Sequence, residues 1–116
     1  MGVIAEAEGI AVTLTFWGTR TGTFLHPESR PGWMFGPTDY DEWAENLCVA
    51  LDYLLHRRGY TCIREVTPVN EPDWSFYSAT RDQARLYVAM CLRLAERLRR
   101  DGLSEEVHLS LSDNSD

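Results

Sequence analysis

The sequence lacks the residue patterns that several classes of site require. Its three cysteines, Cys48, Cys62 and Cys91, are an odd number and form no Cys-x-x-Cys pair, which argues against a disulfide framework and a zinc site. It contains no His-Glu-x-x-His, no Gly-x-Ser-x-Gly and no glycine loop ending in Gly-Lys-Ser/Thr. We therefore expect no metal and no cofactor, and we interpret the cysteines as buried, reduced thiols.

Basic residues and long hydrophobic runs are also scarce. The 116 residues include 11 Lys and Arg against 18 Asp and Glu, giving a net charge of −7. An acidic chain is repelled by nucleic acid and by anionic lipid, and no apolar run approaches the roughly 18 residues of a membrane span. We expect neither nucleic acid nor a membrane as partner. The arginines cluster at Arg93, Arg97, Arg99 and Arg100, where we expect a solvated helix end.

Five periodic segments alternate between strand and helix patterns. Strand-like runs occupy residues 10–16, which we interpret as a buried strand, 62–69 and 107–111. Helical spacing of apolar residues fills the two intervals, 38–59 and 80–102. A β-α-β-α-β order with helical crossovers predicts an α/β fold with a parallel sheet.

Local signals mark the ends of both predicted helices. Thr38 with Asp41 resembles a capping box at the start of the first helix, and Gly59 is suited to follow its last turn. Thr80 is the expected cap of the second helix, which we expect to stop at Gly102. His56 falls in the last turn of the first helix, where it suits the helix dipole.

The loops after the predicted strands hold the residues with chemical potential. The three strands end near Trp17, Glu71 and Asp113. The first of these loops is a long irregular stretch with several glycines and prolines, residues 20–37, and it carries Trp33. Because α/β folds place their chemistry at the carboxyl ends of the strands, we expect the functional site at this edge.

The sequence Asn70-Glu71-Pro72, at a strand end and ahead of a helix, resembles the acid/base strand end of retaining glycoside hydrolases of clan A, the cellulase and glucosylceramidase kind. The resemblance implies that this strand is the fourth of a (β/α)8 TIM barrel. Such a barrel needs roughly 250 residues. Residues 1–116 would then be a partial glycosidase catalytic domain, an incomplete TIM barrel covering about strands three to five.

The resemblance also implies a role for each site residue. Glu71 would be the proton donor and later the base of a double displacement, and Asn70 would bind the 2-hydroxyl of the sugar. The nucleophile of the clan would lie beyond Asp116, on the seventh strand, so the chain alone should be inactive. Trp17, Trp33 and Trp74 are candidates for stacking on a carbohydrate, since an indole face fits the apolar face of a pyranose.

Two other interpretations remain open. The chain could be a non-catalytic carbohydrate-binding or assembly module of α/β type that uses the same tryptophans. Alternatively, Asn70-Glu71-Pro72 could be an ordinary turn after a strand, because such residues are common in turns. In the fragment interpretation the outer strands have no neighbours, and exposed sheet edges favour association. We therefore expect the isolated chain to self-associate.

Overall fold

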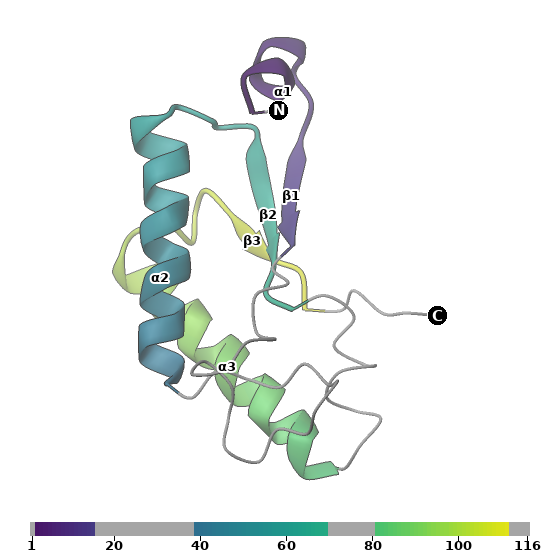
Figure 1. The fold of residues 1–116 in the computed structure, drawn as a ribbon, viewed down its shortest axis with the longest axis vertical. Coiled ribbons are helices and arrows are strands. Elements are labelled where there is room, and N and C mark those ends of the chain that lie inside the picture. The colour runs from purple at the N-terminus through teal and green to yellow at the C-terminus, as the bar shows by residue number, and fades with distance from the viewer. Residues whose placement is uncertain (1, 16–38, 70–80, 112–116) are drawn as a thin grey trace.

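The protein is described by a computed structural model that covers residues 2–15, 39–69 and 81–111. These residues form a small α/β domain with two long helices and a sheet (Figure 1). The elements are, in order, α1 (Gly2–Glu8), β1 (Val12–Thr15), α2 (Tyr40–Asp52), the π-helical turn η2 (Tyr53–Arg57), β2 (Ile63–Thr67), α3 (Arg81–Arg100) and β3 (His108–Leu109).

The sheet has the predicted parallel arrangement. Its order is β1-β2-β3, and both neighbouring pairs are parallel. The helices α2 and α3 contact each other, so both cover the same face of the sheet. They also run in the same direction, because Asp41 and Glu45 of α2 pair with Arg93 and Arg97 of α3, four residues further along in each helix.

An irregularity in β2 decides which side chains face the helices. The register moves from Val12 opposite Ile63 to Thr13 opposite Glu65, so Arg64 is an extra residue in the ladder. Strict alternation would send Ile63 and Val66 to opposite faces, whereas the bulge turns both toward the helices. Both are buried, at 4% and 0% exposure.

The core lies between this apolar sheet face and the two helices. Its most buried members, Leu51, Val66, Leu94 and Leu103, have no exposed surface. A second, smaller cluster joins Val69 to Tyr87, Met90 and Cys91 of α3. All three cysteines are free and buried, which confirms the interpretation of the thiols as core residues.

The helix ends agree with the predicted glycines but not with the first predicted cap. Gly59 and Gly102 adopt positive φ angles of 71° and 75°, which glycine tolerates best. The cap of α2 is Asp39, whose carboxylate accepts the N–H of Glu42 at 3.0 Å. Thr38 and Thr80, the predicted caps, lie outside the described residues.

The strands are shorter than predicted, and the first one is not buried. β1 is half-buried, and Ile10, which we assigned to it, lies before the strand and is 53% exposed. The strand predicted over residues 10–16 is confirmed with narrower bounds, but the expectation that it is buried was wrong. Of residues 107–111 only two are in β3. The strand at 62–69 is confirmed with narrower bounds.

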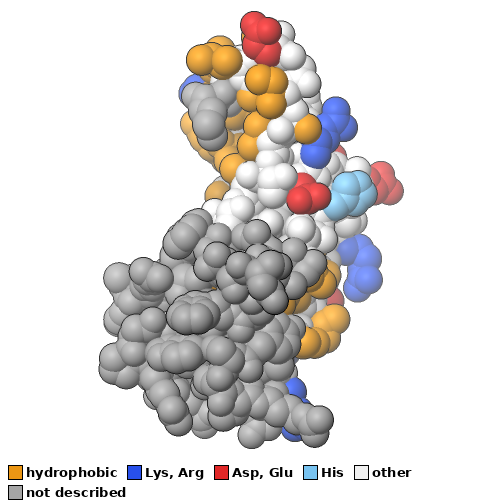
Figure 2. All heavy atoms as spheres, turned by 90° about the vertical axis from the view of Figure 1, so that its right-hand side faces the viewer, with side chains coloured by type: hydrophobic (Ala, Val, Ile, Leu, Met, Phe, Trp, Pro, Cys, Tyr) orange, Lys and Arg blue, Asp and Glu red, His pale blue; other side chains and the backbone are white. Residues whose placement is uncertain are grey.

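Helix α1 was not predicted, and a glutamate holds it in place. Glu6 accepts the hydroxyl of Thr61 at 2.6 Å and the backbone N–H of Cys62 at 2.7 Å, just before β2. These hydrogen bonds, the one from Thr61 foremost, lower the pKa of Glu6. On the same helix Ala5 joins the core, whereas Val3 and Ile4 are exposed. Hydrophobic side chains gather at this end of the molecule (Figure 2).

The tether of α1 gives a prediction about acid stability. Because the folded state lowers the pKa of Glu6, its contribution is present above the unfolded value of about 4.3 and is lost as the pH falls through the lower folded value. We expect Glu6→Gln to destabilise the protein at pH 6 and to lessen the drop in melting temperature between pH 6 and pH 3. Thermal melts by circular dichroism measure both effects. Glu8→Gln, at the end of the same helix, is the control; equal acid sensitivity of Glu6→Gln and the wild type would contradict the tether.

Candidate functional site

The residues predicted to act on a carbohydrate lie outside the described residues. This holds for Asn70 and Glu71 and for Trp17, Trp33 and Trp74. What the structure does describe is the frame from which these segments start. The segments 16–38, 70–80 and 112–116 follow β1, β2 and β3 in the sequence.

The three strands end at one edge of the sheet, as predicted. Thr15, the last residue of β1, is paired with Thr67, the last residue of β2. Leu109 of β3 is paired with Val66, and the N–H of Ser110 donates to the carbonyl of Val66 at 2.9 Å. Because all strands are parallel, this is their shared carboxyl edge. We call it the carboxyl edge and the opposite one the amino edge.

Helix α3 anchors two of the three chain segments that reach the carboxyl edge. Val69, directly before Asn70, is 1% exposed and packs in a cluster with Tyr87, Met90 and Cys91. The hydroxyl of Tyr87 donates to the carbonyl of Leu111, two residues after β3. One side chain therefore helps to fix the starting points of the segments at 70 and 112.

We expect Tyr87→Phe to lower stability by about 1 kcal/mol, a typical contribution of one hydrogen bond. The ring stays in the core, and only the hydroxyl is lost. Chemical denaturation measures the free energy, and hydrogen exchange should quicken near Leu111. Val88→Ala, an exposed position on the same helix, is the control and should be nearly neutral. An unchanged free energy of unfolding for Tyr87→Phe would mean that the hydroxyl is not an anchor.

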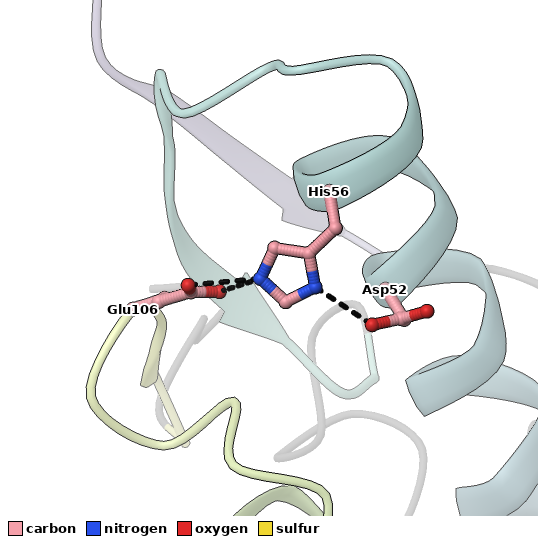
Figure 3. Close-up of polar contacts among 3 residues, drawn as sticks. All are labelled: Asp52, His56 and Glu106. Atoms are coloured by element: carbon pink, nitrogen blue, oxygen red, sulfur yellow. Dashed lines mark hydrogen bonds and ion pairs between the residues drawn. The ribbon is translucent and has the colours of Figure 1, made fainter.

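A histidine bound on both sides lies at the amino edge (Figure 3). Nδ1 of His56 is 2.7 Å from Oδ1 of Asp52, and Nε2 is 2.8 Å from Oε2 of Glu106. The hydrogen bond with Glu106, followed by that with Asp52, raises the pKa of His56. Since both ring nitrogens are engaged, the imidazole has no lone pair free to act as a general base. It is a structural group, and it has two carboxylate partners in addition to the helix end that we expected.

Arginines line a groove between α2 and α3. The groove has a volume of about 370 Å³ and is lined by Asp41, Ala44, Arg93, Glu96, Arg97 and Arg100. Arg93 pairs with Asp41 at 3.1 Å, and Arg97 pairs with Asp101 at 2.9 Å. Arg93, Arg99 and Arg100 are exposed, as expected of a solvated helix end, and Arg97 is half-buried. Two of the four arginines also hold ion pairs. Exposed ion pairs of this kind contribute little to stability, and these acids offset the positive charge of the groove.

Two of the described cysteines are poor nucleophiles, and the described acids form no metal-binding group. Burial raises the pKa of the Cys48 and Cys91 thiols to about 11, which keeps both protonated and poorly nucleophilic. Within residues 2–15, 39–69 and 81–111, no group of three or more His, Cys, Asp and Glu side chains could hold a metal ion. In the same part of the chain, no helix is long and apolar enough to cross a bilayer.

Sequence reasoning missed the roles of three residues at the two edges of the sheet: Tyr87, Asp52 and Glu106. Tyr87 occupies an apolar position of the helical pattern, and nothing in the pattern shows that its hydroxyl reaches Leu111. The contact between His56 and Asp52 could have been recognised from their spacing of four residues within one helix. Glu106 could not, because it lies 50 residues further along the chain.

Comparisons with protein families, with curated proteins and with solved structures give no match to this chain.

Proposed function

We propose that this chain is part of the catalytic domain of a retaining glycoside hydrolase that cleaves β-glycosidic bonds, with Glu71 as its acid/base. The observation that carries the proposal is the position of Asn70-Glu71-Pro72 in the sequence. It begins three residues after Thr67, the end of the central strand of a parallel sheet. In α/β folds, catalytic residues follow strands at this edge.

The winding of the chain supports a barrel. In a (β/α)8 barrel each strand is added next to the previous one, and every helix lies on the outer face. Here β1, β2 and β3 are adjacent in sequence order, and α2 and α3 share one face. Doubly wound sheets instead reverse the strand order and place helices on both faces. The described strands contain no such reversal.

The chemistry assigned to Glu71 follows from its neighbours in the sequence. A retaining enzyme uses two carboxyl groups roughly 5–5.5 Å apart, one to protonate the leaving oxygen and one to attack the anomeric carbon. Pro72 favours an extended backbone at Glu71. Asn70 would bind the 2-hydroxyl, and Trp17, Trp33 and Trp74 would stack on the sugar. The attacking carboxylate would come from outside these 116 residues.

A pair of substrates tests the role of Glu71. In the complete catalytic domain that contains this chain, we expect Glu71→Gln to slow hydrolysis of glycosides with poor leaving groups by about 10²- to 10⁴-fold. Activated aryl glycosides should lose less, because their leaving groups need little protonation. Initial rates on both substrates give the comparison, with Glu105→Gln at the amino edge as control. An equal loss on both substrates, or no loss, would remove Glu71 from the acid role.

A second candidate function is supported by the residues on the face of the sheet that is turned away from α2 and α3. Thr13 and Thr15 of β1, Glu65 and Thr67 of β2, and His108 of β3 are in register across the three strands, on the face away from the helices. Every one of them is polar, whereas the inner face of a (β/α)8 barrel is dominated by Val, Ile and Leu. Thr67 is buried at 3% exposure, whereas Thr13, Thr15 and His108 are exposed. The exposed polar residues favour an open sheet and hence a non-catalytic carbohydrate-binding or assembly module. Its outer strands each pair on one side only among the described residues, which favours association of copies.

The second candidate predicts that the 116-residue chain binds oligosaccharides by itself. We expect Trp17→Ala to weaken binding in calorimetric titrations with β-linked oligosaccharides, because the stacking surface is lost. Glu71→Gln should leave this binding unchanged, since no proton is transferred. Binding that depends on Glu71 as much as on Trp17 would count against the module, and the absence of binding would leave the glycosidase fragment as the proposal.

A further inference from the structure

The bonding of His56 defines its protonation state. The ring contacts a carboxylate at each nitrogen, Asp52 at Nδ1 and Glu106 at Nε2, with distances of 2.7 and 2.8 Å. An ionised carboxylate can only accept hydrogen bonds, and a neutral imidazole has one N–H and one lone pair. Both contacts can therefore be hydrogen bonds only when the ring carries two protons. All three side chains are about half exposed, and exposed carboxyl groups are ionised near neutral pH.

The two contacts differ in what they join. Asp52 and His56 belong to the same helical segment, four residues apart. Glu106 lies in the loop between α3 and β3, and its contact with His56 joins residues 50 positions apart. Figure 3 shows the ring placed between the end of α2 and this loop. The tertiary contact is the one that fixes one part of the fold to another.

The acidic side chains around His56 favour its protonated form. A cavity of about 210 Å³ at this place is lined by Leu55, His56, Thr61, Arg64, Glu105 and Glu106. With a protonated ring, the cations His56 and Arg64 match the two carboxylates of the cavity, Glu105 and Glu106. Asp52 is a third carboxylate, in contact with the ring at Nδ1. Once the ring loses its proton, Arg64 is the remaining cation among the residues that line the cavity, opposite Glu105 and Glu106. Repulsion between carboxylates then adds to the loss of a hydrogen bond.

The loop held by Glu106 leads into the weakest strand. β3 has only two residues, paired with Glu65 and Val66 of β2. Leu103 and Val107 anchor the loop in the core, and Ser110 adds one backbone hydrogen bond to β2. The hydroxyl of Tyr87 holds Leu111, after β3. The contact between Glu106 and His56 adds a charged link from this loop to the helical segment that ends at Arg57. We propose that protonated His56 is a clamp that holds the loop before β3 against the end of α2, and that deprotonation releases this loop and loosens β3.

The pH range in which the clamp is closed follows from the direction in which the pKa of His56 is shifted. The pKa of His56 is raised in the folded protein, by Glu106 first and Asp52 second. The stabilisation is thus fully present below the unfolded value of about 6.5 and is lost as the pH rises through the higher folded value. The clamp is closed below a pH of about 6.5 and opens as the pH rises through the folded pKa of His56.

An NMR titration of the 116-residue chain, combined with amide exchange, tests the clamp. We expect the His56 ring to titrate with a midpoint above about 6.5. Through that midpoint, the protection of the Ser110 amide, which donates to Val66, should fall several-fold relative to intrinsic exchange. The Val12 amide, which donates to Cys62 in the pairing of β1 with β2, should keep its protection and is the internal control.

Variants separate the clamp from a general effect of pH. Glu106→Gln should lower the titration midpoint of His56 and remove the pH dependence of the Ser110 amide protection. Glu105 lines the same cavity but does not contact the ring, so Glu105→Gln should change both quantities less. If Glu106→Gln fails to fold, Asp52→Asn should still lower the midpoint. An ordinary His56 midpoint in the wild type, or Ser110 protection that stays constant through the titration, would overturn the proposal.

Discussion

One extra residue in the central strand determines how this fold is built. β2 is the only described strand with a neighbour on each side, so its apolar face has to meet both helices. Ile63 and Val66 are three residues apart and would point in opposite directions in a regular strand. The bulge at Arg64 brings both into the core. After the bulge, Glu65 and Thr67 lie on the face away from the helices, where Glu65 is half-buried and Thr67 is buried. The apolar helical face and the polar open face of β2 both follow from the bulge.

The sequence predicted the features that depend on local chemistry and missed those that depend on distant contacts. Alternating periodicity was sufficient for the order of the three strands and the two long helices and for the parallel sheet. The glycines at 59 and 102 marked the helix ends, because only a residue without Cβ adopts their φ angles readily. Helix α1 is short and is held by hydrogen bonds from Glu6 to residues 55 and 56 positions away, which no local pattern shows. The bulge was not predicted either, although the two successive polar residues Arg64 and Glu65 between Ile63 and Val66 interrupt strict alternation. At the candidate site, topology predicted the shared edge, while the contribution of Tyr87 required the three-dimensional fold.

The two edges of the sheet are held together by different kinds of interaction. At the carboxyl edge Val69 and Tyr87 are buried in an apolar cluster, so the chain enters the segment containing Asn70 and Glu71 from a fixed point. Such an anchor suits a site, because a side chain that starts from packed backbone loses less entropy on binding. At the amino edge the contacts are charged and exposed, as in the cluster of His56, Asp52 and Glu106. The strength of these charged contacts depends on pH and on salt, because salt screens exposed charges. The packing of the apolar cluster depends much less on either. Changes in solution conditions should thus act first on the edge away from the proposed chemistry.

The polar open face limits the larger folds that could contain this unit. Thr13, Glu65 and His108 form one row across the three strands, and the hydroxyl of Thr13 lies 3.5 Å from a carboxylate oxygen of Glu65. In the dry, apolar interior of a closed barrel, an ionised carboxylate in this row would cost several kcal/mol unless it were fully paired. A single long contact with a hydroxyl does not provide that compensation. The unit is therefore compatible with a barrel only where this row is in contact with water, as it would be beneath an active site that opens at the carboxyl edge. Without such a hydrated interior, the same residues require an open sheet with one solvated face.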